Sequence, residues 1–493
     1  MKTDNHSKEL LKATSIIGSS KIFTILLGVI QTKIVSILLG PLGVGILGLY
    51  KSNIELVRSI TGFGLSFSAV KMIAGADQNE KIISEKIIVL KRWVIFTGLL
   101  GVSVMIIFSK QLSIYAFGDE SKKIPIIVSS IAILFMSISD GQLALLQGKR
   151  LIKEMAKLSI AFSIFNIIIS VPIYYYFKEK GIILVLVLTP FFSMAIAWLK
   201  IRKIKIKKIK LSFLETYLSG KQMIKLGFFI VINGFLSNFT MYLIRIEIGQ
   251  KIDLISVGLV QAGWTLSNMY VGIILNAMLA DFFPRLSKLG NDNEKTNQLI
   301  NQQLKIALIL GTPFVIFMLV FSKFIIKSLY SEEFLMANSL VELLFLNVFL
   351  TLIVWPLGVL FLARDKGMVC IITDFIWNMI TILLVNFGIL KWKLEIVGIA
   401  FCIATIIKIL ITLKVVNRIS EYRISKDNKL IIAVYGVVII LLFLNNKMFN
   451  NSGFNFSNIF LILFSGVFSL FELNKILDIN QTIKRLKKKI INR

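Results

Sequence analysis

Charged side chains inside long apolar stretches are the residues of this chain whose types could do chemistry. At the centre of a helix that faces lipid, a basic side chain costs about 2.5–3.5 kcal/mol. We therefore expect such side chains to face a polar interior, or to reach an interface when they lie near a helix end. In the first half of the chain they would line an internal cavity that suits an anionic ligand. The six basic residues are Lys21, Lys33, Lys51, Arg58, Arg245 and Lys408.

The spacing of Lys51, Glu55 and Arg58 places them on one helix face. At about 100° per residue they fall within about 60° of one another. They could form an ion network that only joins helices, or they could line a cavity; one acid between two bases leaves the face net positive in both cases. Lys21 lies in a stripe of polar and small residues at helical spacing, which indicates a cavity face or close helix packing. The stripe is Thr14, Gly18, Lys21, Gly28 and Thr32.

Acidic residues inside apolar stretches are candidates for ion coupling. An intramembrane carboxylate can bind a proton or Na⁺ and link its movement to transport. We assign this role to Glu55, Asp140 and Glu247. The alternative is that each acid pairs with one of the basic residues, and the i, i+4 spacing of Asp281 and Arg285 predicts such a structural pair. The other two acids are Glu342 and Asp374.

Metal chemistry and histidine catalysis are not expected. The chain has two cysteines, Cys370 and Cys402, both in apolar segments, and one histidine, His6, in the polar N-terminal tail. A zinc site needs more ligands at closer spacing. We therefore expect no metal and no cofactor, and only coupling to a proton or sodium gradient.

Composition identifies the class of protein that must position these charges. The 493 residues are 56% hydrophobic and 17% charged, with a mean hydropathy of +0.81. This excludes a soluble enzyme, a disulfide-rich secreted scaffold and a disordered protein. Apolar runs near 20 residues match a hydrocarbon layer of about 30 Å, whereas β-barrel strands would alternate over about 10 residues. The chain is therefore predicted to be an all-α polytopic membrane protein.

Fourteen membrane spans are predicted, joined by loops too short to hold a folded catalytic domain. The longest polar stretches, near 200–221 and 285–304, have about 20 residues. The spans are 13–38, 44–70, 93–109, 124–147, 158–177, 181–199, 226–248, 254–283, 306–322, 337–363, 367–390, 395–413, 430–446 and 457–474.

The distribution of basic residues predicts the topology. Of the 56 Lys and Arg residues, 39 lie in the tails and even-numbered loops and 11 in the odd-numbered loops. The positive-inside rule then places both termini in the cytoplasm, and no cleaved signal peptide is expected. The net charge of +29 follows from these loops and favours contact with anionic lipids. Nucleic-acid binding is not expected, because no binding domain surrounds the charges.

An internal repeat predicts two six-helix lobes. A shift of 213 residues aligns Lys12 with Lys225 and Val44–Leu47 with Val257–Val260, at matching topological positions. Six spans per repeat give both lobes the same orientation, with a pseudo-twofold axis along the membrane normal. We expect an N-terminal lobe over 1–200, a basic linker over 201–224, a C-terminal lobe over 225–418, and two extra helices with a basic tail over 419–493. The densest basic run is KIRKIKIKKIK, at residues 200–210.

Two stretches resemble the oligosaccharide flippase family (Wzx, O-antigen translocase) of the multidrug/oligosaccharidyl-lipid/polysaccharide exporter superfamily. The first is Lys33–Ala74, with the turn GPLGVG followed by a Gly-rich helix. The second is Val257–Leu289, which ends in a Pro-x-Leu-Ser element. The likeness covers about residues 9–418. Family members usually have twelve spans, so the last two spans depart from the pattern and are closer to the related lipid II flippases.

The resemblance implies two six-helix bundles around a central cavity and alternating access in a bacterial inner membrane. The implied substrate is an undecaprenyl-pyrophosphate-linked oligosaccharide, such as an O-antigen or another surface polysaccharide repeat unit. It also implies that basic residues of the first two helices contact the pyrophosphate. Lys33, Lys51 and Arg58 lie in the matched stretch. With Lys21 added from its helix face, we expect these four to hold the pyrophosphate and Arg245 to close from the second half.

Other functions stay open at this point. A multidrug/cation antiporter of the same fold would need an acidic or neutral cavity, and a lipid II-type flippase would share the fold. A membrane glycosyltransferase or polymerase would need a long outer loop or paired acids, which the sequence lacks. A structural scaffold would not need six buried cations. Polysaccharide polymerase or ligase machinery is an expected partner of a flippase.

Overall fold

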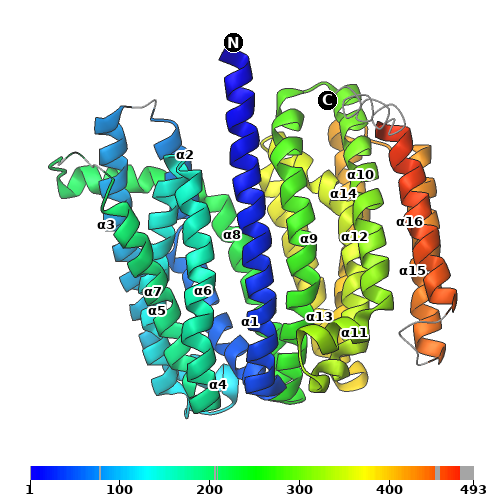
Figure 1. Cartoon of the computed structure of the whole chain (residues 1–493), viewed down its shortest axis with the longest axis horizontal. Helices are drawn as coiled ribbons and strands as arrows, with labels where there is room; N and C mark the ends of the chain where they lie inside the picture. The colour runs from blue at the N-terminus through cyan, green and yellow to red at the C-terminus, as the bar shows by residue number, and fades with distance from the viewer. Residues whose placement is uncertain (1, 77–78, 205–206, 208, 450–455, 478–493) are drawn as a thin grey trace, which may run out of the picture. The chain divides into compact units, whose positions relative to one another are not determined.

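The chain is described here by a computed structural model that covers residues 2–76, 79–204, 207, 209–449 and 456–477 (Figure 1). Within these residues, side chains are described from Ser19 onward, except at 226, 229–230, 269–270, 273, 280 and 447–449. All regular elements of the described residues are helices. A backbone that crosses lipid must satisfy its own hydrogen bonds, and a helix does so within one segment. The all-α class is therefore confirmed.

The helices fall into two compact units. Unit 1 comprises Met1–Leu259 and Leu329–Glu333, and unit 2 comprises Val260–Ser328 and Phe334–Arg493. The helices of unit 1 are α1 (Lys2–Thr61), α2 (Leu65–Ala74), α3 (Glu80–Ile107), α4 (Ser109–Phe117), α5 (Lys123–Gly148), α6 (Ile152–Phe177), α7 (Ile182–Ile201) and α8 (Phe213–Lys251), with a 3₁₀ turn at Lys178–Gly181.

The second unit takes up most of α9 and all the long helices that follow it. Pairs of these helices pack along their length, among them α10 with α12, α12 with α14, and α15 with α16. Its elements are α9 (Leu254–Lys288), α10 (Asn293–Val320), α11 (Ser322–Leu329), a 3₁₀ turn at Glu332–Ala337, α12 (Asn338–Ala363), α13 (Gly367–Trp392), α14 (Glu395–Ser420), α15 (Lys426–Phe449) and α16 (Phe456–Leu477).

The membrane spans expected from the sequence correspond to long apolar helices. Ten ranges of the described residues are long and apolar enough to cross a membrane. Two of them, Ser19–Thr61 and Ile152–Ile201, each contain two expected spans. The ten ranges therefore account for twelve of the fourteen expected spans, and the other two, 226–248 and 254–283, fall within α8 and α9.

The expected span 44–70 is broken near its end. Most of this span lies in α1, which is also kinked earlier, at Gly40 (φ 62°). Pro41 follows directly and has no N–H to continue the helical hydrogen bonds. Helix α1 then ends at Thr61, and α2 begins at Leu65. Between them, Phe63 has φ 47° and Gly64 has φ 64°, a left-handed conformation that ends a helix. The TGFG sequence thus produces two helices where hydrophobic length alone predicts one.

The first turns of α8 lie across the N-terminal half of α3 (Figure 1). A capping box starts α8: the Ser212 hydroxyl accepts from the N–H of Glu215, and the Glu215 carboxylate accepts from the N–H of Ser212. The indole N–H of Trp93 donates to the Thr216 carbonyl at 3.0 Å. The second half of the expected linker, which follows the basic run at 200–210, is therefore helical and part of unit 1.

The two compact units do not divide at the expected lobe boundary. The expected C-terminal lobe started at 225, but α8 packs against α1, α2, α3 and α4 of unit 1. The division into lobes over 1–200 and 225–418, and the axis that would relate them, stay predictions from the repeat.

Gly45 and Gly258, which the repeat aligns, pack against each other within unit 1. A Cβ atom built on Gly45 would lie 2.9 Å from the backbone nitrogen of Gly258, and one built on Gly258 would lie 3.0 Å from that of Gly45. Only glycine allows two helix backbones to approach this closely. The close packing of the two helices therefore explains the last glycine of the GPLGVG turn, Gly45.

Candidate functional site

A cavity of about 390 Å³ opens between α1, α2, α3, α5 and α8 of unit 1. Its size is within the range of about 300–1,000 Å³ that is typical of ligand sites. It is lined by Glu55, Arg58, Ser59, Gly62, Gly64, Leu65, Ser66, Phe67, Val94, Thr97, Ser137, Asp140, Val231, Gly234 and Asn238.

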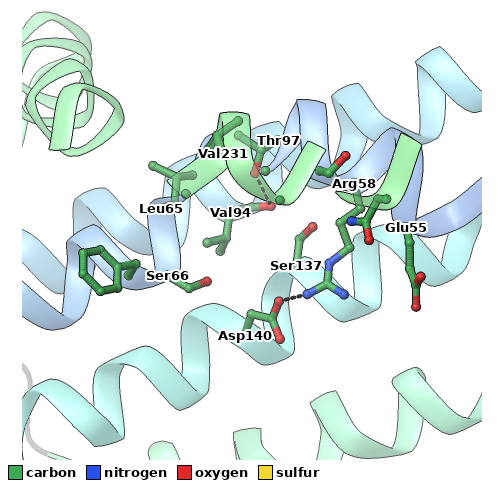
Figure 2. A pocket seen from close by; sticks show the side chains of 15 residues that line it. Glu55, Arg58, Leu65, Ser66, Val94, Thr97, Ser137, Asp140 and Val231 are labelled. Carbon is green, nitrogen blue, oxygen red and sulfur yellow. Dashed lines mark hydrogen bonds and ion pairs between the residues drawn. The ribbon is translucent and has the colours of Figure 1, made fainter. Parts of the chain in front are cut away.

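An ion pair between Arg58 of α1 and Asp140 of α5 crosses this cavity (Figure 2). The side chains are 33% and 36% exposed, so the pair lies in the cavity wall and can be reached by a ligand. The other guanidinium nitrogen of Arg58 lies 3.8 Å from the Met136 sulfur. Arg58 and Asp140, assigned to substrate binding and to ion coupling, are therefore brought together in one pair.

Lys51 and Arg245 extend the charged site beyond the pair. Arg245 is buried and donates to the hydroxyl of Ser52. Glu55, which lines the cavity, lies close enough to Lys51 and Arg245 to act on both charges. Lys51 itself has an exposed side chain. Lys51, Glu55 and Arg245 therefore lie near one another, and their roles in binding and coupling stay predictions.

The charge balance of the site is positive by a small margin. Lys51, Arg58 and Arg245 supply three cations, and Glu55 and Asp140 supply two carboxylates. Because Asp140 neutralises Arg58 in this structure, an anion must compete with a carboxylate for the guanidinium.

The start of α2 adds a second feature that favours an anion. The first-turn residues Leu65, Ser66 and Phe67 line the cavity, and Gly64 provides no side-chain cap for the helix. The uncapped N–H groups at the start of a helix carry a partial positive charge and bind anions. A prediction from hydrophobic length alone misses this helix start, because the break at Gly62–Gly64 lies inside an apolar stretch.

Neutral polar side chains complete the cavity, and sequence reasoning missed them. Ser137 lies one helical turn before Asp140, and Asn238 lies two turns before Arg245. In each case a polar residue shares a helix face with an intramembrane charge. This spacing could have identified both residues from the sequence. Thr97 of α3 also lines the cavity and follows no such charge.

Five residues assigned to the site are not among those that line the cavity: Lys51 and Arg245 lie near the lining residue Glu55, and the other three have other surroundings. Lys21 has an exposed side chain on the first part of α1, next to exposed Ile22. Lys33 donates to the carbonyl of Tyr330. Glu247 pairs with Lys251 one turn further along α8, at 2.6 Å. Their roles in substrate binding and ion coupling stay predictions. Thr14 and Gly18 of the stripe around Lys21 lie outside the described side chains.

Two basic residues of unit 2 form ion pairs with acids of the same unit. The Lys408 ammonium lies 2.5 Å from the Asp374 carboxylate, and Arg285 lies 3.0 Å from Asp281. Both agree with the structural pairing that the sequence offered for them. No group of three or more His, Cys, Asp and Glu residues that could hold a metal ion occurs among the described residues.

The long apolar helices define a multi-pass helical membrane protein. The chain is similar to a structure of the lipid II flippase MurJ in an inward closed conformation, with 18% identity, a TM-score of 0.68, and coverage of 93% of this chain and 98% of the flippase. It is similar to an inward-facing multidrug resistance MATE family transporter of the MOP superfamily, with 12% identity, a TM-score of 0.65, and coverage of 81% and 96%. A MOP superfamily transporter from Pyrococcus furiosus matches with 12% identity, a TM-score of 0.58, and coverage of 83% and 96%. At these identities the likeness establishes the fold.

A family comparison takes the assignment further. Residues 17–339 match the family described as polysaccharide biosynthesis protein. Because this match covers more than half of the chain, the protein belongs to that family. No curated protein matches the chain. The resemblance to oligosaccharide flippases is confirmed at the level of this family, and the fold is shared with structures of a MATE family transporter and of a lipid II flippase.

Proposed function

We propose that this protein is a flippase that moves an undecaprenyl-pyrophosphate-linked oligosaccharide across a bacterial inner membrane by alternating access. The oligosaccharide would be an O-antigen or a related surface polysaccharide repeat unit. The proposal is supported by the family and, above all, by one observation: a cation, Arg58, lines a cavity between long apolar helices, and Lys51 and Arg245 lie near Glu55, which also lines it. Both termini would lie in the cytoplasm.

The pyrophosphate would bind between Lys51, Arg58 and the start of α2. Lys51 has an exposed side chain, and the first turn of α2 offers N–H groups to the cavity. Arg245, held by Ser52, would add a fixed positive charge behind them. The polyprenyl tail would remain in the lipid phase.

The pair of Arg58 with Asp140 offers a way to couple transport to an ion gradient. An incoming pyrophosphate would compete with Asp140 for the guanidinium. The released carboxylate could then take up a proton or Na⁺, and loss of that ion would restore the pair and expel the substrate. Glu55, close to Lys51 and Arg245, could act in the same way.

A second candidate function is a multidrug/cation antiporter. The observation that favours it is that Glu55 and Asp140 both line the cavity, which has only Arg58 as a lining cation. An organic cation would then bind the carboxylates directly. A lipid II-type flippase is a closer alternative, since it would use the same anionic group with a different glycan.

A gene deletion tests the proposal. The deletion should remove surface glycan and leave undecaprenyl-linked oligosaccharide on the cytoplasmic side. Wild type and Lys391→Ala, an exposed control at the end of α13, should restore the glycan, whereas Lys51→Ala and Arg58→Ala should not. Unchanged glycan with altered drug tolerance would contradict the proposal and favour the antiporter.

A further inference from the structure

A second, apolar groove lies in unit 1 between α3 and the first turns of α8. It has a volume of about 790 Å³, which is larger than the charged cavity. Its lining is mostly aromatic and aliphatic, and includes Phe63, Trp93, Phe96, Leu100, Phe213 and Ile224. None of the residues that line this groove has a role in the proposed transport mechanism.

The first turns of α8 have the two faces of a helix that lies at a membrane surface. Thr216, Ser219, Gly220 and Met223 are buried at helical spacing and form the face against α3. Beside this face, Phe213 and Tyr217 line the groove and are still exposed, Phe213 by 87%. Leu214, which is 64% exposed, and Leu218 are exposed next to them. An exposed apolar stripe beside a basic sequence is typical of an interfacial helix. The groove therefore opens where headgroups and lipid chains meet.

Specific contacts hold the groove walls in place. The Arg92 guanidinium donates to the Leu211 carbonyl at 3.1 Å and to the Thr216 hydroxyl at 2.5 Å. The Trp93 indole packs so close to Gly220 that a Cβ at this position would clash with the ring. These contacts hold the two helices together beside the groove, so that its walls are fixed in place.

The charges around the groove mouth are net positive, with two lysines against one glutamate. Lys210 and Lys225 directly adjoin the lining residues Leu211 and Ile224 in sequence, and both are exposed. The nearby acid, Glu215, already accepts the N–H of Ser212 in the capping box. A basic rim above an apolar channel is complementary to a lipid with an anionic headgroup.

We propose that this groove binds one chain of an anionic phospholipid, with its phosphate held at the basic rim. The lining residues of α3 run from Arg92 to Leu100, which spans about 12 Å along the helix. A chain that enters at Arg92 therefore passes from the membrane surface into the hydrocarbon layer. The bound lipid fastens the start of α8 to α3.

This site is separate from the transport cavity and does not depend on the proposed function. On α3, Val94 and Thr97 line the charged cavity, whereas Trp93, Phe96 and Leu100 line the groove. The two sites thus use different faces of one helix, and a variant of the groove need not alter the cavity.

Trp93 provides a direct probe of occupancy. The full-length protein is prepared with Trp93 as its single tryptophan, the other five being replaced by Phe, and is reconstituted in phosphatidylcholine vesicles. Phosphatidylglycerol brominated on its chains is then titrated in, with brominated phosphatidylcholine as the reference. We expect Trp93 fluorescence to be quenched saturably and preferentially by the brominated phosphatidylglycerol.

Two matched variants locate the lipid chain. Leu100→Phe adds bulk inside the groove, and Leu99→Phe adds the same bulk on the neighbouring exposed position. The first should weaken phosphatidylglycerol binding about tenfold, and the second should leave it unchanged. Replacing Lys210 and Lys225 by Gln should remove the preference over phosphatidylcholine. The same comparison is then made by native mass spectrometry on proteins that keep all their tryptophans: wild type, Leu100→Phe and Leu99→Phe.

Three results would overturn the proposal. The first is equal quenching by both brominated lipids, which would mean no anionic site. The second is an undiminished phosphatidylglycerol preference in Leu100→Phe, which would place the chain elsewhere. The third is displacement of phosphatidylglycerol by undecaprenyl phosphate at lower concentration, which would assign the groove to an isoprenoid chain. A failed transport assay leaves all three readouts unaffected.

Discussion

Arg58 and Asp140 lie 82 residues apart in the chain and form an ion pair across the wall of the cavity in unit 1. Arg58 comes from α1 and Asp140 from α5, so the pair joins two helices that both line the cavity. Each side chain is about one third exposed, which leaves the pair open to competition by a ligand. The pair therefore joins the two helices, and its opening would free the Arg58 guanidinium to bind an anion.

A charge swap separates these two roles. Arg58→Gln or Asp140→Asn should each lower stability by about 1–2 kcal/mol, between the values for exposed and buried pairs. Combining Arg58→Asp with Asp140→Arg should restore the melting temperature in detergent but not complement the gene deletion, because the positive charge then sits on α5. Complementation by the swapped variant would mean that Arg58 only joins the helices.

Lys51 should matter for transport and not for folding. Within the described residues it makes no hydrogen bond or ion pair, although it lies near the charges of Glu55 and Arg245. We expect Lys51→Ala to keep the melting temperature of wild type and to lose surface glycan in complementation. Lys51→Arg, which keeps the charge, should retain part of the activity. A Lys51→Ala variant that restores full glycan would remove this residue from the binding site.

The contact between Gly45 and Gly258 should not tolerate a methyl group. A Cβ on either glycine would lie about 3 Å or less from backbone atoms of the other helix, and overpacking of this kind costs about 1–3 kcal/mol. Gly45→Ala should therefore lower the melting temperature. Gly234→Ala on α8 is the matched control, because nothing lies within 4 Å of a Cβ built there. Equal melting temperatures for the two variants would contradict the packing assignment.

Glu342 should stabilise unit 2 as a hydrogen-bond acceptor. It is 7% exposed, and one carboxylate oxygen accepts from Asn338 at 2.8 Å, Ser322 at 3.3 Å and Asn446 at 3.3 Å. Glu342→Ala would leave buried donors without an acceptor and should cost about 1–3 kcal/mol. Glu342→Gln keeps an acceptor oxygen and should cost less. Thermal unfolding in detergent measures both, and a Gln variant as unstable as Ala would mean that the charge itself is required.

The helices could be predicted from the sequence because apolar length alone identifies a membrane span. The break at Gly62–Gly64 and the surface segment at the start of α8 could not. In the first, left-handed Phe63 and Gly64 interrupt a stretch whose apolar length predicts one continuous helix. In the second, the helix begins inside a polar region, and its buried face becomes evident only when it lies on α3.

The charged residues of the site could be identified from the sequence, but their partners could not. Intramembrane charges such as Arg58 and Asp140 are visible because each is costly in lipid. Their pairing depends on how α1 packs against α5, which no local pattern contains. The same limit explains Lys33, whose partner is the carbonyl of Tyr330, almost three hundred residues away in the chain.

Lipid flipping by purified protein tests the central claim most directly. The protein is reconstituted in vesicles that contain a fluorescent undecaprenyl-pyrophosphate oligosaccharide, and a membrane-impermeant reagent reports how much of it reaches the outer leaflet. Wild type and Lys391→Ala should expose the inner pool, whereas Lys51→Ala and Arg58→Gln should leave it protected. Wild-type protein that leaves the inner pool protected under both proton and sodium gradients, or variants that flip as well as wild type, would contradict the account.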